Sequence, residues 1–417
     1  MNVFYIIADD LTGASDSGVQ FAKRGYKTSL LFNYKENYIW SIDARVIVID
    51  SDSRAIPPEA AYERVARLVS VLRPPSAQLL FKKVDSTLRG NIQAEVKAVL
   101  DTLPQSTAFI VPAYPKNGRT TRNGNQLLRG VPVHETEIGQ DPKTPVFSSF
   151  IPDLFDDTCA VIDTASTEKG LLYLENRIRE LISAGNRRIV FDAESNEHLE
   201  TIGRLYSRFP DAVWVGSAGI AEYLNPPLPM NESDQVLPKL RKPLLFLIGS
   251  LSESTRMQVE ACSIERFFTL RLDPVLLLEK DASELLPASL FDAYRAGKHC
   301  IVALDSTEQA RQSTAAFAEA RKLPKASMSE LLREALGKMS KVLVSELAPE
   351  CLFLSGGDTA RSICEHLDIA GMNILQELEP GIPLGRVAGK NFHLVTKAGA
   401  FGNARSFENI AEQLTKE

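Results

Sequence analysis

The stretch FYIIADDLTGASDSGVQFAKRG (residues 4–25) sets the architecture that we predict for this chain. Its first five residues, FYIIA, form an apolar run that is typical of a buried strand. A helix is expected after Thr12, because small and apolar side chains recur there at helical spacing and Gly25 supplies a C-terminal stop. The stretch therefore predicts a strand–turn–helix unit with two aspartates at its turn.

The same pattern repeats along the first half of the chain. Further apolar runs occur in KTSLLF, RVIVID, LLFKKV, FIVPAY, RIVFDA and AVWVGSAG, with amphipathic stretches between them. Strands that alternate with helices favour a mostly parallel sheet with helices on both faces. Residues 115–150 interrupt the rhythm, and a β-hairpin or lid-like excursion is expected there.

A proline-rich, polar segment at residues 225–243 separates this half from a second α/β half. A chain of 417 residues is also too long for one ordinary core, which favours two domains. We predict a first domain at residues 1–228 and a second at residues 240–417, each with a mostly parallel sheet flanked by helices. The strands expected in the second domain are PLLFLIGS, HCIVALD, CLFLSGGDTA and FHLVTKAGAFGN.

Composition argues against several classes of protein. The formal net charge of −6 disfavours nucleic acid as the main partner, because phosphate backbones select basic faces. No apolar run approaches the roughly 20 residues that span a bilayer, and no basic segment opens a signal peptide, so no membrane partner is expected. Five scattered cysteines and the lack of HExxH or paired CxxC motifs predict reduced thiols in a cytoplasm and no zinc site. The pattern leaves the oligomeric state open, with a homodimer as one option.

Three expected strands of the second half end in small, glycine-containing turns, in LLFLIGSLSESTRMQ, CLFLSGGDTARSIC and FHLVTKAGAFGN. Ligands of open α/β sheets lie beyond the carboxyl ends of strands, and glycine lets the backbone approach them closely. A helix that follows such a turn, as expected near Ala360, directs N–H groups at the same place, so the three turns can converge on one polyphosphate. The candidate ligands are Ser250, Ser252, Gly356, Gly357, Asp358, Thr359, Gly399 and Gly402.

Each turn taken alone is better explained as a helix cap, and the grouping of three is what favours a nucleotide site. The chain contains no GxxxxGK[ST] motif and no GxGxxG motif after a strand. A P-loop NTPase and a Rossmann dehydrogenase are therefore disfavoured.

Charged residues also gather at strand ends in the first half. Asp9 and Asp10 end the first strand, and because successive strand side chains diverge, we expect only one to face a site; in the alternative, one of them only caps the helix after Thr12. Arg54 can pair bidentately with a carboxylate. These charges suit a small acid that bears several hydroxyl groups. The candidate substrate residues are Asp9, Asp10, Arg54, Lys83, Val84, Asp85, Ser86 and Arg89.

The alternative interpretation is that these groups are helix caps and solvated surface charges. Lys82 is expected to be solvated. Lys116, Arg119 and Arg122 of the interrupting segment are further cations that can close over the same anion, although loop arginines are usually only solvated.

Taken together, these motifs resemble the four-carbon acid sugar kinase family over nearly the whole chain. The resemblance is carried, in order, by IADDLTGASDSG, KKVDSTLRGN, VPAYPKNGRTT, VGSAGIAEYL, GSLSESTRMQ, LSGGDTARSI and KAGAFGN. It implies an N-terminal substrate domain, a C-terminal nucleotide domain, and transfer of phosphate from ATP to the C4 hydroxyl of a four-carbon acid. D-threonate is the preferred substrate in this interpretation, with D-erythronate and 3-oxo-tetronate as alternatives.

The resemblance also places site residues. The substrate site falls on Asp10, Arg54 and residues 83–86, and the ATP site on residues 356–359, on Gly402 and on a serine of the GSLSES turn. Ser250, Ser252 and Ser254 are all candidates for that serine.

Phosphoryl transfer requires positioning and charge neutralisation, which the glycine turns and Mg²⁺ would supply. Asp358 is our first candidate for the group that accepts the hydroxyl proton, and Asp10 is the second. Two rival functions are an NAD-dependent dehydrogenase, disfavoured by the missing fingerprint, and a sensor that binds a sugar acid without consuming ATP. In a third alternative the glycine turns are only structural.

Overall fold

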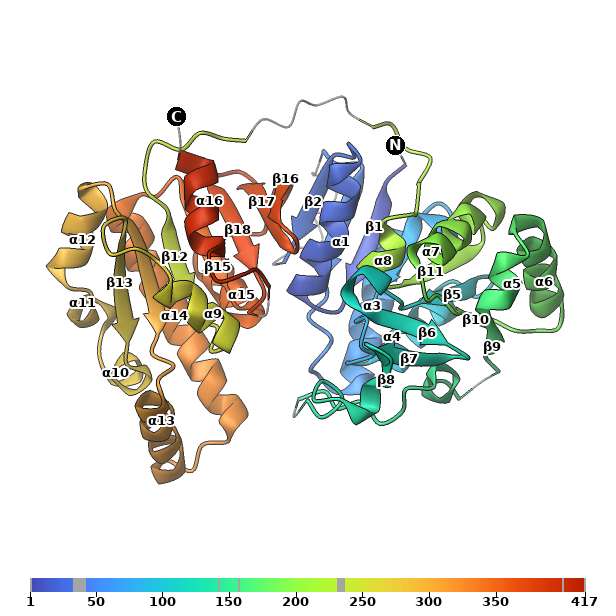
Figure 1. Ribbon diagram of the computed structural model, residues 1–417, viewed down its shortest axis with the longest axis horizontal. Coiled ribbons are helices and arrows are strands. Elements are labelled where there is room, and N and C mark those ends of the chain that lie inside the picture. The colour runs from blue at the N-terminus through green and yellow to red at the C-terminus, as the bar shows by residue number, and fades with distance from the viewer. Residues whose placement is uncertain are drawn as a thin grey trace. The chain divides into compact units, whose positions relative to one another are not determined.

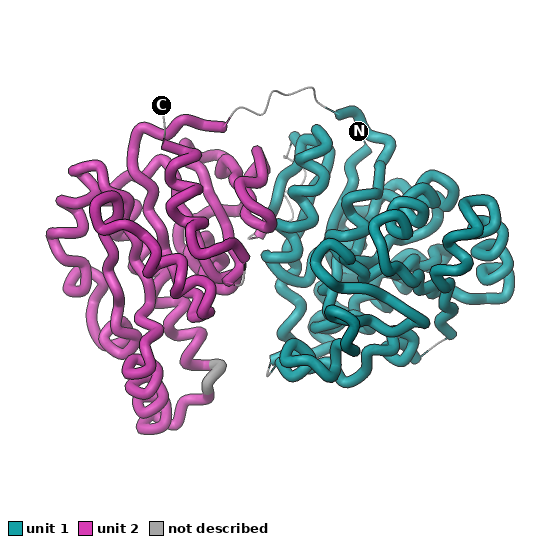
Figure 2. The backbone as a smooth tube through the Cα atoms, in the orientation of Figure 1, with its two compact units in different colours: residues 1–30, 36–232 teal, residues 31–35, 233–417 magenta. Residues whose placement is uncertain are grey.

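The computed structural model describes residues 2–32, 43–141, 143–156, 158–230, 237–399 and 401–415. The chain forms two compact units, residues 1–30 with 36–232 and residues 31–35 with 233–417 (Figure 2). Both are α/β units, which confirms the predicted fold class. The units change over at residue 232, inside the expected linker, of which residues 231–236 lie outside the described part. The assignment of residues 31–35 to the second unit was not predicted.

Unit 1 is built on a sheet of eight strands among its described residues (Figure 1). Their order is β2 (Thr28–Leu31), β3 (Val46–Asp50), β1 (Phe4–Ala8), β4 (Leu80–Lys83), β11 (Ala212–Gly216), β5 (Thr107–Val111), β10 (Arg188–Phe191) and β9 (Ala160–Ile162). The pairings from β3 to β9 are all parallel. Parallel strands end at a common edge, so the turns after β1, β3 and β4 lie near one another.

The helices of unit 1 follow its strands as the sequence pattern predicts. They are α1 (Leu11–Lys23), α3 (Pro58–Leu72), α4 (Ile92–Thr102), α5 (Thr164–Glu168), α6 (Leu171–Ser183), α7 (Asn196–Gly203) and α8 (Ala218–Ala221), with 3₁₀ turns at Ala77–Leu79, Pro115–Asn117, Val133–Glu135, Ile151–Leu154 and Arg204–Arg208. Helix α1 begins at Leu11, not after Thr12 as expected. The reason is that the Asp10 carboxylate accepts a hydrogen bond from Gly13 N at 2.7 Å and caps the helix, a contact worth about 1 kcal/mol.

Residues 115–150 contain the expected hairpin. Strands β6 (Arg119–Arg122) and β7 (Asn125–Leu128) pair in antiparallel fashion, and β8 (Val131–Pro132) extends them to a three-stranded sheet. The core of unit 1 lies under the large sheet, where the fully buried Trp214 packs edge-on against Phe109 at a ring distance of 5.5 Å.

Unit 2 has seven strands among its described residues, of which five are parallel. Their order is β13 (Phe267–Leu272), β14 (His299–Leu304), β12 (Leu245–Ile248), β15 (Cys351–Ser355), β18 (His393–Lys397), β17 (Ile382–Val387) and β16 (Gly371–Glu379). Strands β16 and β17 form an antiparallel hairpin beside β18. Strands β13, β16 and β17 were not predicted. Strands β13 and β16 are partly exposed, and β17 is largely buried but has its apolar run interrupted by Pro383, Gly385 and Arg386.

The helices of unit 2 are α9 (Glu253–Glu260), α10 (Pro274–Glu279), α11 (Ala282–Leu285), α12 (Ala288–Arg295), α13 (Glu308–Ala320), α14 (Lys325–Leu347), α15 (Gly357–His366) and α16 (Ser406–Thr415). Helix α15 begins at Gly357, three residues before the expected start near Ala360. Phe246 of β12 stacks on Phe353 of β15 at 4.8 Å, and Phe407 of α16 packs against both. This aromatic cluster joins β12 and β15, which precede the first two glycine turns, to α16, which follows the third. Across the described helices, none has the length and hydropathy needed to cross a membrane.

Candidate active site

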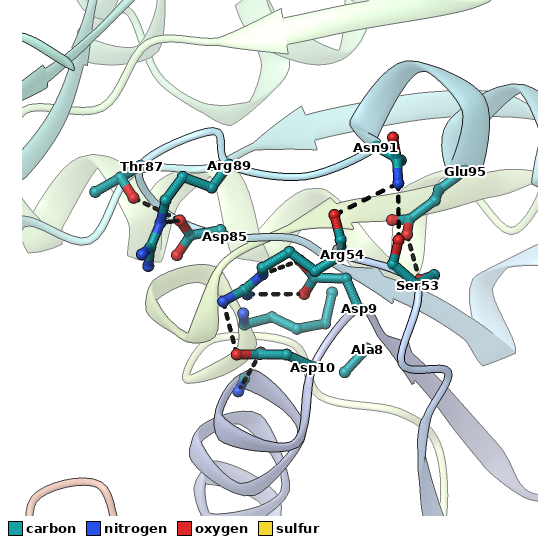
Figure 3. Close-up of polar contacts among 12 residues, drawn as sticks. Ala8, Asp9, Asp10, Ser53, Arg54, Asp85, Thr87, Arg89, Asn91 and Glu95 are labelled. Atoms are coloured by element: carbon teal, nitrogen blue, oxygen red, sulfur yellow. Dashed lines mark hydrogen bonds and ion pairs between the residues drawn. The ribbon is translucent and has the colours of Figure 1, made fainter. Parts of the chain in front are cut away.

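The first site lies at the carboxyl end of β1, where two adjacent aspartates share one arginine (Figure 3). Arg54 donates to Asp9 from Nε at 2.7 Å and from Nη2 at 3.1 Å, and its Nη1 donates to Asp10 at 2.6 Å. Both carboxylates therefore face one guanidinium, and the expectation that only one would face a site is wrong. The strand ends at Ala8, so the alternation of strand side chains no longer governs the two residues that follow.

Burial opposes ionisation of both carboxyl groups, but the surrounding charges leave their two pKa values shifted in opposite directions. Asp9 is 2% exposed, but Arg54 and two lysines outweigh burial and hold its pKa below the ordinary value. The pKa of Asp10 is raised, because burial and the Asp9 charge outweigh the effect of Arg54. One carboxylate thus stays ionised while its neighbour takes up a proton more readily, a division typical of acid–base sites.

Lys83, the last residue of β4, brings an ammonium group to the same place. It is 4% exposed, and its charge acts on both Asp9 and Asp10. A Cβ atom added to Gly13 would lie 2.5 Å from Lys83 Nζ, so the absence of a side chain in α1 makes this approach possible. Among the described residues no acceptor takes a hydrogen bond from Lys83 Nζ. Its donors are therefore available to a ligand.

Asp85 and Arg89 form a second ion pair in the turn after β4. Arg89 Nε donates to Asp85 Oδ2 at 2.7 Å, and the Thr87 hydroxyl donates to the same oxygen. Burial opposes ionisation of Asp85, but Arg54 and Arg89 outweigh it and hold its pKa far below the ordinary value. The two ion pairs are therefore electrostatically linked through Arg54.

Two other candidates in this turn act through their backbone. Val84 is buried and its N–H donates to Gly216 O at 2.9 Å, so its side chain offers no polar group. The Ser86 carbonyl accepts a hydrogen bond from Gln126 Nε2 at 2.6 Å. That bond ties the turn to the β6–β7 hairpin.

Lys116, Arg119 and Arg122, the cations in and beside the β6–β7 hairpin, differ in the groups with which they interact. Lys116 is paired with Glu222, and Arg122 is paired with Glu194. Neither pairing involves a carboxylate of the Asp9–Arg54 cluster. Closing of these two side chains over the acid, which the sequence raised as an option, is not supported by their contacts.

Arg119 is different. Its Nε is buried and has no hydrogen-bond partner among the described residues, while Nη1 donates to the Asn117 carbonyl at 2.9 Å. Burial lowers the pKa of Arg119, and the charges of Asp85 and Arg89 act on it as well. Arg119 is thus the hairpin cation that belongs electrostatically to the first site.

A buried ion pair that the sequence analysis missed lies behind this cluster. Lys82 is fully buried, not solvated as expected, and its Nζ lies 2.9 Å from Glu95 Oε2. The Ser53 hydroxyl donates to the other Glu95 oxygen (Figure 3). Both faces of a parallel sheet are covered, which is why the strand hides both lysines. The position of Glu95, three residues after Ile92 on the inward face of α4, was the signal available in the sequence.

The second site lies in unit 2, at the carboxyl ends of the neighbouring parallel strands β12, β15 and β18. Gly249 N and Ser250 N both donate to Ser355 O, at 3.0 and 3.2 Å. Gly356 N donates to Lys397 O at 2.9 Å. The three glycine turns that the sequence singled out are therefore joined by backbone hydrogen bonds at one edge of one sheet.

Side chains are excluded where these turns meet. A Cβ atom on Gly249 would lie 2.0 Å from Thr359 Oγ1, and one on Gly399 would lie 2.4 Å from Ser250 Oγ. Gly356 has a φ of 104°, in the left-handed region that favours glycine. Glycine is therefore required at these positions for the turns to lie close together.

The first turn of α15 carries two further candidates. Gly357 begins the helix and Asp358 follows it, with an exposed side chain. The N-terminal N–H groups of a ten-residue helix have no partner within the helix and favour anions.

Hydroxyl groups and one lysine, Lys397, connect the first and third turns. Ser252 caps α9, accepting from Thr255 N at 3.2 Å, and donates to Gly399 O at 2.8 Å. Thr255 Oγ1 also donates to Gly399 O, at 3.0 Å, and lies 3.3 Å from Lys397 Nζ. The sequence analysis named neither Thr255 nor Lys397. The signal for Lys397 was its place at the end of a buried strand, as the first residue of KAGAFGN.

These two sites define a class of protein: a two-unit α/β protein with a buried cluster of charged side chains at the strand ends of one unit and three glycine turns at the strand ends of the other. The sugar-binding N-terminal domain family matches residues 4–224, and the nucleotide-binding C-terminal domain family matches residues 245–407. The chain belongs to the four-carbon acid sugar kinase family that combines these domains, as its motifs suggested.

Individual relatives agree over the full length. The chain is 32% identical to the D-threonate kinase of Salmonella typhimurium, with 95% of each chain covered. It is 30% identical to the D-erythronate kinase of Heliobacterium modesticaldum, covering 97% of this chain and 95% of the relative. A crystal structure of a Haemophilus influenzae protein shares the fold, with a TM-score of 0.75, 23% identity, and coverage of 98% of this chain and 99% of that one.

Proposed function

We propose that this protein transfers the terminal phosphate of ATP to the C4 hydroxyl of a four-carbon sugar acid, with D-threonate as the first candidate substrate. The observation that carries the proposal is the meeting of three glycine turns at neighbouring strand ends in the unit that matches a nucleotide-binding family. The relatives named D-threonate, D-erythronate and 3-oxo-tetronate kinase support the substrate class.

Unit 1 would bind the acid. Arg54 donates three hydrogen bonds to Asp9 and Asp10. It therefore holds these two carboxylates in place and is less available to bind the carboxylate of the substrate. Among the described residues, Lys83 Nζ and Arg119 Nε donate no hydrogen bond. We therefore assign the carboxylate of the acid to these two side chains. The exposed edges of Asp10 and Asp85 would accept hydrogen bonds from the substrate hydroxyls.

Unit 2 would bind the nucleotide. We assign the phosphates to the residues that the sequence named, Ser250 and Ser252, residues 356–359, and Gly399 and Gly402. Ser252 already caps α9 and bonds Gly399 O, which makes Ser250 the better candidate for a direct contact, through its hydroxyl.

Mg²⁺ is expected to accompany ATP. The described residues contain no group of three or more His, Cys, Asp or Glu side chains able to hold a metal ion. That fits Mg²⁺, which is usually held by one or two carboxylates and by the phosphates of the nucleotide. Asp358 is the carboxylate placed to contribute. The ion would neutralise charge that develops during transfer.

Two carboxylates are candidates for accepting the hydroxyl proton. Asp10 is supported by its raised pKa and its place beside Lys83. Asp358 is supported by its position at the N-terminus of α15, next to the proposed phosphates. The two assignments are separated by Asp10→Asn and Asp358→Asn: the variant of the base keeps binding its ligand and loses turnover. Asp368→Asn, at the exposed far end of α15, is the matched control.

The activity test is ADP release from ATP and Mg²⁺ in a coupled assay, with D-threonate, L-threonate, D-erythronate and 3-oxo-tetronates as separate acceptors. The account predicts ADP formation that depends on one of these acids. Binding of an acid without ADP release would instead identify a sensor, and a change in nicotinamide absorbance would identify a dehydrogenase.

A further inference from the structure

Lys397, at the end of β18, is surrounded by oxygen atoms. It is 3% exposed, and its Nζ lies 3.0 Å from Ala398 O, 3.1 Å from Gly399 O and 3.1 Å from Phe401 O. Thr255 Oγ1 is a fourth neighbour at 3.3 Å. An ammonium group has three protons and is surrounded here by four acceptors, so it acts as an internal cation at the centre of the loop.

The direction of these carbonyl groups determines where the loop's N–H groups point. In a planar trans peptide the C=O of one residue and the N–H of the next point in opposite directions. Because Ala398 O and Phe401 O point toward Lys397, the N–H groups of Gly399 and Gly402 point away from it. Backbone N–H groups that face away from the internal cation are free to donate to an anion.

Two further observations agree with that arrangement. Within the described chain, neither Gly399 N nor Gly402 N donates to a backbone carbonyl. Gly402 has a φ of 81°, and a Cβ atom there would lie 2.4 Å from Ser406 Oγ. The loop is thus held in a conformation that only glycine adopts easily, with two donors left for a ligand.

We infer that Lys397 is the positioning residue of the phosphate site: its ammonium holds the carbonyls of Ala398, Gly399 and Phe401 inward so that the N–H groups of Gly399 and Gly402 meet a nucleotide phosphate. Lys397 itself does not contact the phosphate. The inference rests on the proposed nucleotide site in unit 2 and adds the residue that organises it.

The charge state of Lys397 links the loop to pH. Burial lowers the pKa of Lys397 to about 8, and the nearby Glu379 carboxylate, at the end of β16, partly offsets this. The other groups against the ammonium are the uncharged Thr255 hydroxyl of α9 and the Phe407 ring of α16, at 5.9 Å. A bound phosphate would favour the charged form, so nucleotide binding above about pH 8 should be coupled to uptake of a proton.

The first test compares ADP, the analogue AMPPNP and adenosine in calorimetric titrations of the full chain at pH 7. Lys397→Met should weaken ADP and AMPPNP roughly 10- to 100-fold, as expected for the loss of two well-aligned donors to a charged group. Adenosine, which has no phosphate, should change less than about threefold. Lys390→Met is the matched control, because the Lys390 ammonium also binds a backbone carbonyl but lies exposed at Leu367.

A second variant addresses the role of the cation itself. Lys397→Ala should regain part of its ADP affinity when propylammonium is added, because the small cation can occupy the vacated oxygen cage. Unchanged ADP affinity in a folded Lys397→Met protein, or an equal loss for adenosine and ADP, overturns the inference. Wild-type protein that binds neither ADP nor AMPPNP would refute the proposed nucleotide site instead.

The third measurement needs no variant and therefore holds even if Lys397 variants do not fold. The ADP-binding enthalpy of wild-type protein is recorded at pH 7 and pH 9 in buffers of different ionisation enthalpy. Net proton uptake at pH 9, absent at pH 7, is the expected result. Equal proton balance at the two pH values would exclude a phosphate-linked ammonium.

Discussion

Replacing Arg54 with methionine is the sharpest test of the charge cluster in unit 1. The change removes three charge-assisted hydrogen bonds and leaves Asp9, 2% exposed, without its bidentate partner. Removing one partner of a buried pair costs about 3–5 kcal/mol, because the remaining charge stays desolvated. We therefore expect Arg54→Met to lower the free energy of unfolding of unit 1 by about that amount at pH 7.

The stability cost of Arg54→Met should change with pH in a defined direction. Arg54 lowers the pKa of Asp9, so its contribution to stability is complete above the unfolded pKa of about 4 and is lost as pH falls through the folded value. In Arg54→Met the carboxyls can protonate at a higher pH, which relieves part of the cost. The difference between wild type and variant should therefore be largest near pH 8 and shrink toward pH 5.

Hydrogen exchange of peptides from β1, read by mass spectrometry, reports the stability of unit 1 by itself. Arg64→Met is the matched control, because the Arg64 side chain is 42% exposed, its ion pair with the exposed Asp52 is 3.8 Å long, and its remaining bonds go to the uncharged carbonyls of residues 51 and 52. It should cost less than about 1 kcal/mol. An Arg54→Met cost that is no larger than the Arg64→Met cost, or that grows toward pH 5, would refute the reasoning.

Three further predictions concern other parts of the molecule. Lys82→Met should destabilise unit 1 by about 3–5 kcal/mol in the same exchange measurement, because the buried Glu95 carboxylate loses its partner. The double variant Lys82→Met, Glu95→Leu should recover most of this stability. An equal loss in the single and double variants would argue against an unpaired Glu95 charge as the cause. Gly249→Ala should weaken ADP binding roughly tenfold in calorimetry, because its Cβ falls 2.0 Å from a threonine hydroxyl, whereas Gly389→Ala, whose Cβ meets nothing within 4 Å, should not. Burial lowers the pKa of His299 to about 4, so the unfolded chain alone takes up that proton between about pH 6.5 and 4 and unit 2 should lose stability there; flat urea midpoints over that range would contradict this.

The arrangement of strands and turns was predictable because it depends on local pattern. Apolar runs mark buried strands, and parallel strands bring their ends to one edge, so the glycine turns of unit 2 could be grouped before any contact was known. Strands β9, β13, β16 and β17 carry no long apolar run and were missed. Helix starts were displaced by one to three residues, because caps such as Asp10 depend on side-chain geometry that periodicity does not contain.

The charge partners were less predictable, since they depend on contacts between distant segments. Arg54 was expected to bind a substrate carboxylate, but its bidentate partner in the folded chain is Asp9, 45 positions away. Lys82 was expected in solvent because a lysine usually is, and Glu95 was not considered. Lys397 lay inside a recognised motif, yet its function follows from carbonyl directions that only three-dimensional structure supplies.

The most direct measurement for the account as a whole is phosphorus NMR of a reaction that contains the protein, ATP, Mg²⁺ and D-threonate. A phosphate ester on the C4 hydroxyl couples to two protons on one carbon, so the account predicts a new triplet that grows as ADP appears. Inorganic phosphate as the only new signal besides those of ADP, or an ester doublet from a secondary hydroxyl, would contradict transfer to C4.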